Sequence, residues 1–152
     1  MIDAMSHVGV WVADQDEAKA FYTEKLGFEV REDATLEELG GYRWLTVGPP
    51  GQPDFRLILS RPGPPAVDPD AAEQVLGLVA KGAMGGGIFR TQDCRATCRE
   101  LEARGLELAQ QPVERFYGID ATFRDPSGNL WRIVQELEYD LDAIKERSGE
   151  AG

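Results

Sequence analysis

Histidine and cysteine, the side chains that most often bind transition metals, are scarce in this sequence. The 152 residues contain one histidine, His7, and two cysteines, Cys94 and Cys98. The cysteines are four residues apart on one side of an expected helix, and no further Cys or His cluster completes a zinc site with them. Two cysteines also do not form the disulfide framework of a small secreted protein. We expect two small, buried or half-buried helix residues rather than half of a metal site or a redox pair.

Positive charge and long apolar runs are also lacking. Sixteen Lys and Arg residues against 27 Asp and Glu residues give a formal net charge of −11. Such a surface repels a phosphate backbone, so we expect no nucleic-acid partner. No apolar run reaches the ~18–20 residues of a membrane span. The first five residues have neither the basic start nor the apolar stretch of a signal peptide, so we expect a cytoplasmic protein without membrane association.

Two stretches of the chain repeat one order of elements. In each, a short strand precedes a helix, an aspartate begins the helix, a glycine ends it, and further strands follow. The interval from Asp14 to Gly27 has the same length as that from Gln92 to Gly105. Apolar residues make up 42% of the chain, which is enough for a buried core. An internal duplication is the economical explanation.

We therefore predict an α+β fold of two βαβββ modules that form a curved mixed sheet with a concave cleft. The first module is residues 5–60 and the second is residues 88–135. Between them, residues 61–87 form a Pro/Gly-rich linker with room for a short helix, and residues 136–152 form a C-terminal helix and tail. The expected strands are 7–12, 28–33, 42–47, 55–60, 88–91, 106–109, 114–117, 120–124 and 130–134, and the expected helices are 14–26, 69–81, 93–104 and 141–147.

Alternation along these strands predicts which side chains point away from the helices. With Leu57, Leu59, Trp131 and Ile133 packed against the helices, the residues between them point into the cleft. The predicted cleft and ligand-binding residues are His7, Trp11, Trp44, Arg56, Phe89 and Arg132.

Three segments resemble the vicinal oxygen chelate superfamily, which includes glyoxalase I, extradiol dioxygenases, fosfomycin-resistance proteins and bleomycin-binding proteins. The resemblance covers nearly all of residues 5–135 and implies the same two-module fold. The segments that carry it are His7-Val8-Gly9-Val10-Trp11-Val12, Ala20-Phe21-Tyr22 with Leu26-Gly27-Phe28, and Phe123-Arg124-Asp125-Pro126-Ser127-Gly128-Asn129.

The resemblance also implies four metal-binding positions, and this chain departs from the pattern at three of them. The positions fall on His7, on Arg56, on or near Gly87, and on Arg132. A divalent metal requires carboxylate or imidazole ligands there, whereas arginine offers only donors and glycine has no side chain. We predict no cofactor, although a divalent metal held by His7 together with a nearby carboxylate or with ligand atoms stays open.

The cleft residues each have more than one interpretation. His7 is a metal ligand, a general base or a hydrogen-bonding cleft residue. Arg56 and Arg132 clamp an anion, pair with local acids such as Asp54, Glu114 or Asp120, or turn outward to solvent. The aromatic residues Trp11, Trp44 and Phe89 either stack on a flat ligand or pack against the other module or a second subunit.

We predict a glyoxalase- and bleomycin-resistance-like protein that has lost most of its metal site and binds a small aromatic or anionic molecule in the cleft. The alternative is a lyase, isomerase or dioxygenase of the superfamily, either metal-independent with His7 as base or with a non-standard metal site. A regulatory subunit with a vestigial cleft is a third interpretation, so catalysis stays undecided. Because an open cleft exposes apolar surface, we expect a homodimer, with modules paired within one chain or across the dimer.

Overall fold

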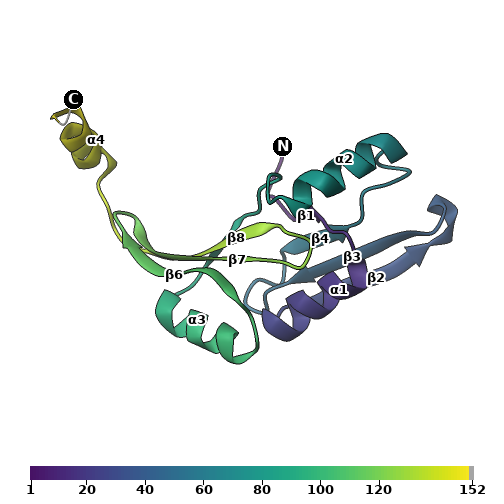
Figure 1. Ribbon diagram of the computed structural model, residues 1–152, viewed down its shortest axis with the longest axis horizontal. Coiled ribbons are helices and arrows are strands. Elements are labelled where there is room, and N and C mark those ends of the chain that lie inside the picture. Colours follow the sequence, from purple (N-terminus) through teal and green to yellow (C-terminus); the bar gives the residue numbers. More distant parts are fainter. Residues whose placement is uncertain (151–152) are drawn as a thin grey trace.

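The computed structural model describes residues 1–150 and consists of two βαβββ modules, each built on its own four-stranded mixed sheet (Figure 1). The strand order is β1-β4-β3-β2 in the first sheet (sheet 1) and β5-β8-β7-β6 in the second (sheet 2). In each sheet the first strand is parallel to its neighbour and the other pairs are antiparallel. The predicted α+β class is therefore confirmed.

The elements follow the chain in the same order in both halves. The first module comprises β1 (His7–Trp11), α1 (Gln15–Ala20), β2 (Glu29–Leu36), β3 (Tyr42–Gly48) and β4 (Arg56–Ser60). A π-helical turn (Phe21–Lys25) continues α1, and a 3-10 turn (Glu37–Leu39) joins β2 to β3. The second module comprises β5 (Ile88–Arg90), α3 (Cys94–Ala103), β6 (Leu108–Arg115), β7 (Gly118–Arg124) and β8 (Leu130–Glu136), with α2 (Pro69–Ala80) before it and α4 (Leu141–Glu150) after it.

Short local signals begin and end the two module helices. The Asp14 carboxylate accepts a hydrogen bond from the Glu17 backbone N–H at 2.9 Å, and Asp93 caps α3 in the same way. Gly27 and Gly105 follow the helices with φ of 72° and 88°, a backbone conformation that residues with a Cβ atom rarely adopt. These features are local in sequence, so the helix positions were predictable.

Strand β6 corrects one prediction. The ranges 106–109 and 114–117 were expected to be two strands, but the structure has one strand, β6, and Tyr117 lies in the turn before β7. Irregularities between Leu108 and Gln110 and between Gln110 and Val113 break the alternation, and Pro112 interrupts the apolar pattern. A bulged strand with a proline is tolerated here because β6 lies at the edge of its sheet.

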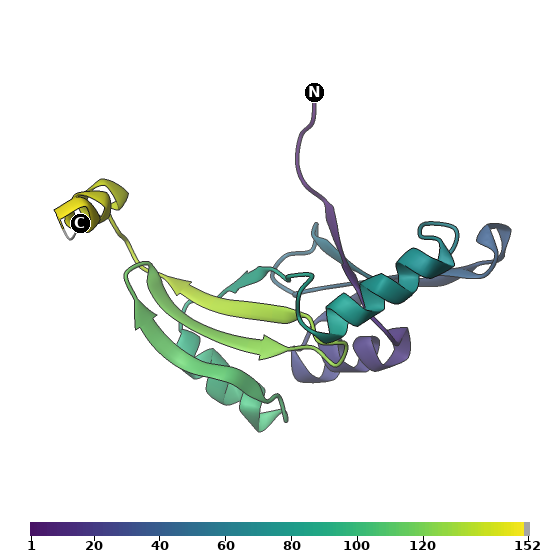
Figure 2. The ribbon, with the colours of Figure 1, turned by 45° about the horizontal axis from the view of Figure 1, so that its top comes forward.

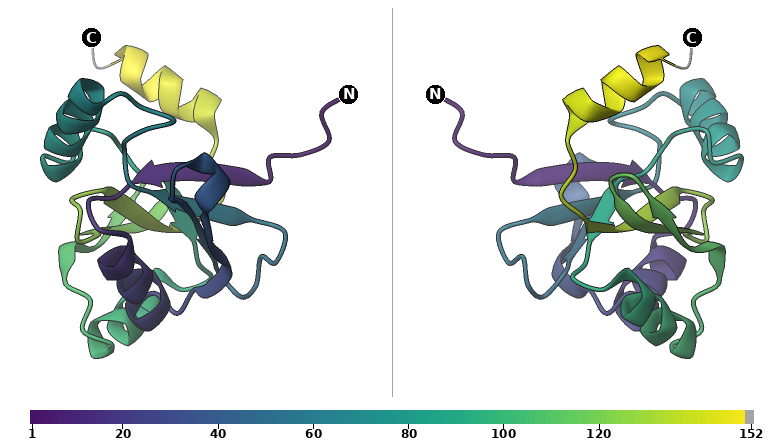
Figure 3. Two further views of the ribbon diagram at one scale, coloured as in Figure 1. Left: turned by 90° about the vertical axis from the view of Figure 1, so that its right-hand side faces the viewer. Right: turned by 90° about the vertical axis from the view of Figure 1, so that its left-hand side faces the viewer.

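Helices α1 and α3 cover the same side of the two sheets and share one core (Figures 1 and 3). Cys94 and Cys98 lie on the inner side of α3, both buried, as expected. Burial raises the pKa of the Cys98 thiol to about 12, with a further contribution from Cys94, so this thiol stays protonated and unreactive. The cysteines are packing residues of the core.

A buried hydrogen-bonded chain joins the two modules. The Tyr22 hydroxyl donates to the Asp125 carboxylate at 2.7 Å and accepts from the Trp131 indole N–H at 2.8 Å. Burial, followed by the Asp125 charge, raises the pKa of Tyr22 well above its usual value, so the phenol remains neutral and can donate. The second oxygen of Asp125 accepts three backbone N–H groups of the turn between β7 and β8.

The opposite side of each sheet is not covered by α1 or α3, and we call it the open face. Helices α2 and α4 and the N-terminal segment all lie on that side (Figure 3), and the N-terminal segment extends away from the body (Figure 2). Within residues 1–150 no helix is long and apolar enough to cross a membrane.

Candidate functional site

The pairing of strands places most of the predicted cleft residues on the open faces. In sheet 1, His7 lies beside Arg56, and Trp11 lies beside Ser60. Trp44 is two residues from Thr46, which pairs with Ile58 on the same face. In sheet 2, Arg132 lies beside Ile88. The predicted side is confirmed for five residues, His7, Trp11, Trp44, Arg56 and Arg132, and their role in ligand binding stays a prediction.

Phe89 is the exception, and its predicted side was wrong. It pairs with Ile133 on the helix-covered face, and its ring stacks on that of Trp131 with centroids 4.5 Å apart. Ile88 takes the open face instead and is 66% exposed. Strand β5 has only three residues, two of them apolar, so alternation could not assign the face. The parallel register with β8 assigns it.

The Glu32 carboxylate connects residues on the open face of sheet 1. No pattern in the sequence had indicated this residue. Glu32 accepts a hydrogen bond from the Trp44 indole N–H at 2.8 Å and another from the Arg56 guanidinium at 2.9 Å. These bonds, that of Trp44 first, hold the pKa of Glu32 below its usual value. The His7 ring lies 5.9 Å from the Trp44 ring. The irregularity between Val30 and Glu32 breaks the alternation of β2, which hid this position.

The open face of sheet 2 contains a second acidic centre. The Asp120 carboxylate is fully buried and accepts hydrogen bonds from Arg132 at 2.8 Å, Arg115 at 3.4 Å, Gln110 at 3.1 Å and the Tyr117 hydroxyl. Burial by itself raises the pKa of Asp120, but the bonds from Tyr117 and Arg115 outweigh it and hold this pKa below its usual value. The carboxylate is therefore ionised at neutral pH.

These contacts change the interpretation of the two arginines. Arg56 and Arg132 lie on different sheets, and each is bound to a carboxylate of its own sheet. For Arg132 the partner is Asp120, as the alternative of local pairing allowed. The Arg56–Glu32 pair is neutral, whereas Asp120 faces two guanidinium groups and leaves one positive charge in excess. Of these two arginine centres, that of sheet 2 alone has an excess positive charge to offer an anion.

The four family metal positions do not fit a metal ion in this chain. His7 can supply one ligand atom, Nε2, because Nδ1 shares a hydrogen bond with the Ser6 hydroxyl at 2.8 Å, and one imidazole does not make a metal site. At Gly87 a Cβ atom would lie 2.8 Å from a ring carbon of Trp131, so a ligating side chain has no room there. The other two positions are the paired arginines, Arg56 and Arg132. Across residues 1–150 no three His, Cys, Asp or Glu side chains gather where they could hold a metal.

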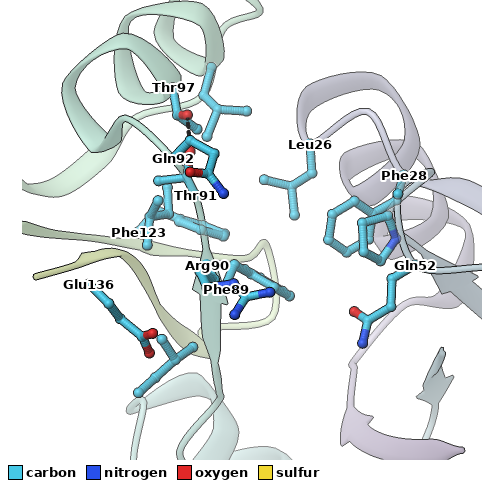
Figure 4. A pocket seen from close by; sticks show the side chains of 15 residues that line it. Leu26, Phe28, Gln52, Phe89, Arg90, Thr91, Gln92, Thr97, Phe123 and Glu136 are labelled. Carbon is cyan, nitrogen blue, oxygen red and sulfur yellow. Dashed lines mark hydrogen bonds between the residues drawn. The ribbon is translucent and has the colours of Figure 1, made fainter. Parts of the chain in front are cut away.

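A cavity of about 870 Å³ opens between the two modules (Figure 4), and of the predicted cleft residues Phe89 is part of its lining. At one joint between modules, the Asn129 amide donates to the Trp11 carbonyl at 2.8 Å, and Ser127 accepts from the Ala13 N–H at 2.9 Å. At the other joint lies this cavity, whose lining includes Leu26, Phe28, Gln52, Phe89, Arg90, Thr91, Gln92 and Glu136. It depends on how the modules pack, which no local sequence pattern encodes.

Comparisons with known proteins agree with this architecture. Residues 4–133 match the family profile of the Glyoxalase/Bleomycin resistance protein/Dioxygenase superfamily. An uncharacterized protein of Shewanella frigidimarina (strain NCIMB 400) is 32% identical over 138 residues, covering 89% of this chain and 95% of that protein. The crystal structure of UcmS2 is similar with a TM-score of 0.82 and 45% identity, covering 90% of this chain and 100% of that one. That of TnmS3, an antibiotic binding protein from Streptomyces sp. CB03234, has a TM-score of 0.70 and 32% identity over 90% of this chain and 98% of that one. The chain belongs to the Glyoxalase/Bleomycin resistance protein/Dioxygenase superfamily.

Proposed function

We propose that this protein has lost the metal site and binds a small aromatic molecule on the open face of sheet 1. The observation that carries the proposal is the set of rings on that face, Trp11, Trp44 and His7, with the His7 ring 5.9 Å from the Trp44 ring. Aromatic side chains on a concave surface offer large apolar contact to a flat ligand. The description of TnmS3 as an antibiotic binding protein supports small-molecule binding in a similar fold.

We further propose that the ligand is neutral or anionic. The sheet 1 centre around Glu32 and Arg56 is neutral, and the sheet 2 centre around Asp120 has an excess guanidinium group. A cationic ligand gains nothing from either centre, whereas a carboxylate can share the exposed guanidinium donors of Arg115 and Arg132. An acidic group on an aromatic ligand therefore increases affinity.

The site is proposed to be completed by a second copy of the chain. Both open faces point away from α1 and α3, so within one chain they do not close over a ligand (Figures 1 and 3). Ile88, which pairs with Arg132 on the open face of sheet 2, is 66% exposed. Apolar residues left on open strands are the type of surface that a partner chain covers. A homodimer would place one open face over another.

Calorimetric titration of chelator-treated protein with 2-naphthol and 2-naphthoate tests this function. We expect binding without metal, tighter for 2-naphthoate, and a loss of about fivefold to tenfold for both compounds in Trp11→Leu because a ring contact contributes ~1 kcal/mol. Phe116→Leu, which removes an exposed ring from the turn before β7, serves as the matched control.

Two outcomes would contradict the proposal. One is equal loss of affinity in Trp11→Leu and Phe116→Leu, because it would place the ligand away from sheet 1. The other is elemental analysis that finds about one tightly bound nickel, zinc, manganese or iron ion per chain after metal loading. Glyoxalase and dioxygenase assays would then follow.

A further inference from the structure

Thr46 carries an unpaired hydroxyl in the middle of the open face of sheet 1. The residue is fully buried, and its Oγ1 atom has no hydrogen-bond partner within residues 1–150. Buried hydroxyl groups are nearly always hydrogen-bonded, because leaving one unpaired costs free energy. An exception on the face that carries the candidate ligand site therefore needs an explanation.

The position of Thr46 in the sheet shows what surrounds this hydroxyl. Thr46 pairs with Ile58 of β4 on one side and with Glu32 of β2 on the other. Ile58 in turn pairs with Gly9, which adds no side chain to the face. Across the four strands the row therefore consists of Gly9, Ile58, Thr46 and Glu32. On the open face it presents no side chain at Gly9, then an apolar side chain, a hydroxyl and a carboxylate. Such a row resembles the floor of a site more than a packed core.

The side chain of Trp44 extends toward this row. Trp44 lies one row away on β3, yet its indole N–H reaches the carboxylate of Glu32, the residue paired with Thr46. Its ring also approaches His7, which lies on the far side of the Gly9–Ile58 pair. Because the indole makes both contacts, we infer that it lies over the row that contains Thr46.

We propose that Thr46 is the hydrogen-bonding anchor of the ligand site and that Trp44 is a movable cover above it. This inference rests on the proposed function and narrows its substrate class to flat aromatic molecules with a hydroxyl or carbonyl group at the ring edge. A ligand that displaces the indole gives the hydroxyl its missing partner, and a threonine hydroxyl both donates and accepts. At Thr46 the ligand hydrogen bond replaces an unpaired hydroxyl, and displacement of the indole breaks the bond between the Trp44 N–H and Glu32.

The decisive experiment compares 2-naphthol with naphthalene, which has the same rings and no hydroxyl group. We expect Thr46→Val to weaken 2-naphthol binding about threefold to tenfold, the usual range for one hydrogen bond, and to leave naphthalene binding unchanged. Thr46→Ser keeps the hydroxyl and should bind both compounds as the wild type does. Calorimetric or tryptophan-fluorescence titration gives the affinities.

A second measurement needs no ligand. Valine has the shape of threonine, so Thr46→Val should melt at or above the wild-type temperature if the hydroxyl has no partner. Ser60→Ala is the control, because the Ser60 hydroxyl is bonded to the Tyr42 hydroxyl at 3.1 Å and its removal should lower the melting temperature.

Each result separates this inference from the function on which it rests. If both compounds bind and Thr46→Val changes neither affinity, the anchor is wrong and the aromatic site stands. If neither compound binds the wild type, the aromatic site and the anchor both fail. A clearly lower melting temperature of Thr46→Val would also overturn the anchor, because it would show that the hydroxyl already has a structural partner.

Discussion

At the scale of single residues, Asp120 is a fully buried carboxylate that lies between two half-exposed guanidinium groups. The Arg132 and Arg115 side chains are 45% and 43% exposed, so solvent screens the positive side of the pairs. The carboxylate itself has no access to water and depends on its donors, among them the Tyr117 hydroxyl. We therefore expect the stability of the protein to depend more on the negative charge of Asp120 than on either arginine.

Asp120→Asn should lower the free energy of unfolding by about 1–3 kcal/mol at pH 7, because it removes the shared acceptor charge. The folded-state pKa of Asp120 is below the unfolded-state value, so its contribution is present above the unfolded-state pKa and is lost as the pH falls through the folded-state pKa. Urea unfolding at pH 7 and pH 3 should show a difference between variant and wild type that shrinks at the lower pH. The exposed Asp54→Asn is the control, and an equal effect of both variants would contradict the prediction.

At the scale of elements, one phenol connects the π-helical turn after α1 with the β7–β8 turn and with β8. Tyr22 comes from the helical segment of the first module, and both of its partners, Asp125 and Trp131, come from the second. The Asn129 amide adds a bond from the same turn to β1. These buried bonds fix how the two sheets lie relative to each other.

Tyr22→Phe should lower the free energy of unfolding by about 1–3 kcal/mol, because it leaves the buried Trp131 N–H without its acceptor. Chemical denaturation followed by fluorescence measures this change. Tyr139→Phe, at an exposed position, should change it by less than about 0.5 kcal/mol. A Tyr22 variant as stable as the wild type would show that the phenol bonds do not hold the modules together.

At the scale of the whole molecule, the net charge of −11 opposes the apolar surface of the open strands. Association of two acidic chains is weakened by repulsion at low ionic strength and strengthened when salt screens it. Sedimentation velocity at micromolar concentration should show a homodimer whose dissociation constant falls as sodium chloride increases from about 20 mM to about 500 mM, as the Debye length shortens. A monomer under both conditions would contradict the proposed assembly.

Local patterns in the sequence determined much of this protein. The aspartate caps, the terminal glycines and the alternation of the longer strands predicted the two modules and the faces of His7, Trp44 and Arg132. Each of these signals acts within a few residues of the chain, because helix caps and strand alternation are local properties.

Only the tertiary structure decided which distant side chains meet. The register of β5 turned Phe89 toward the helices, the bulge in β2 brought Glu32 to Arg56, and β7 placed Asp120 beneath Arg132. The unpaired hydroxyl of Thr46 and the cavity between the modules have the same origin. The physical reason is that a one-residue shift between paired strands exchanges every side chain between the two faces, and the energy of the whole packed core selects that shift.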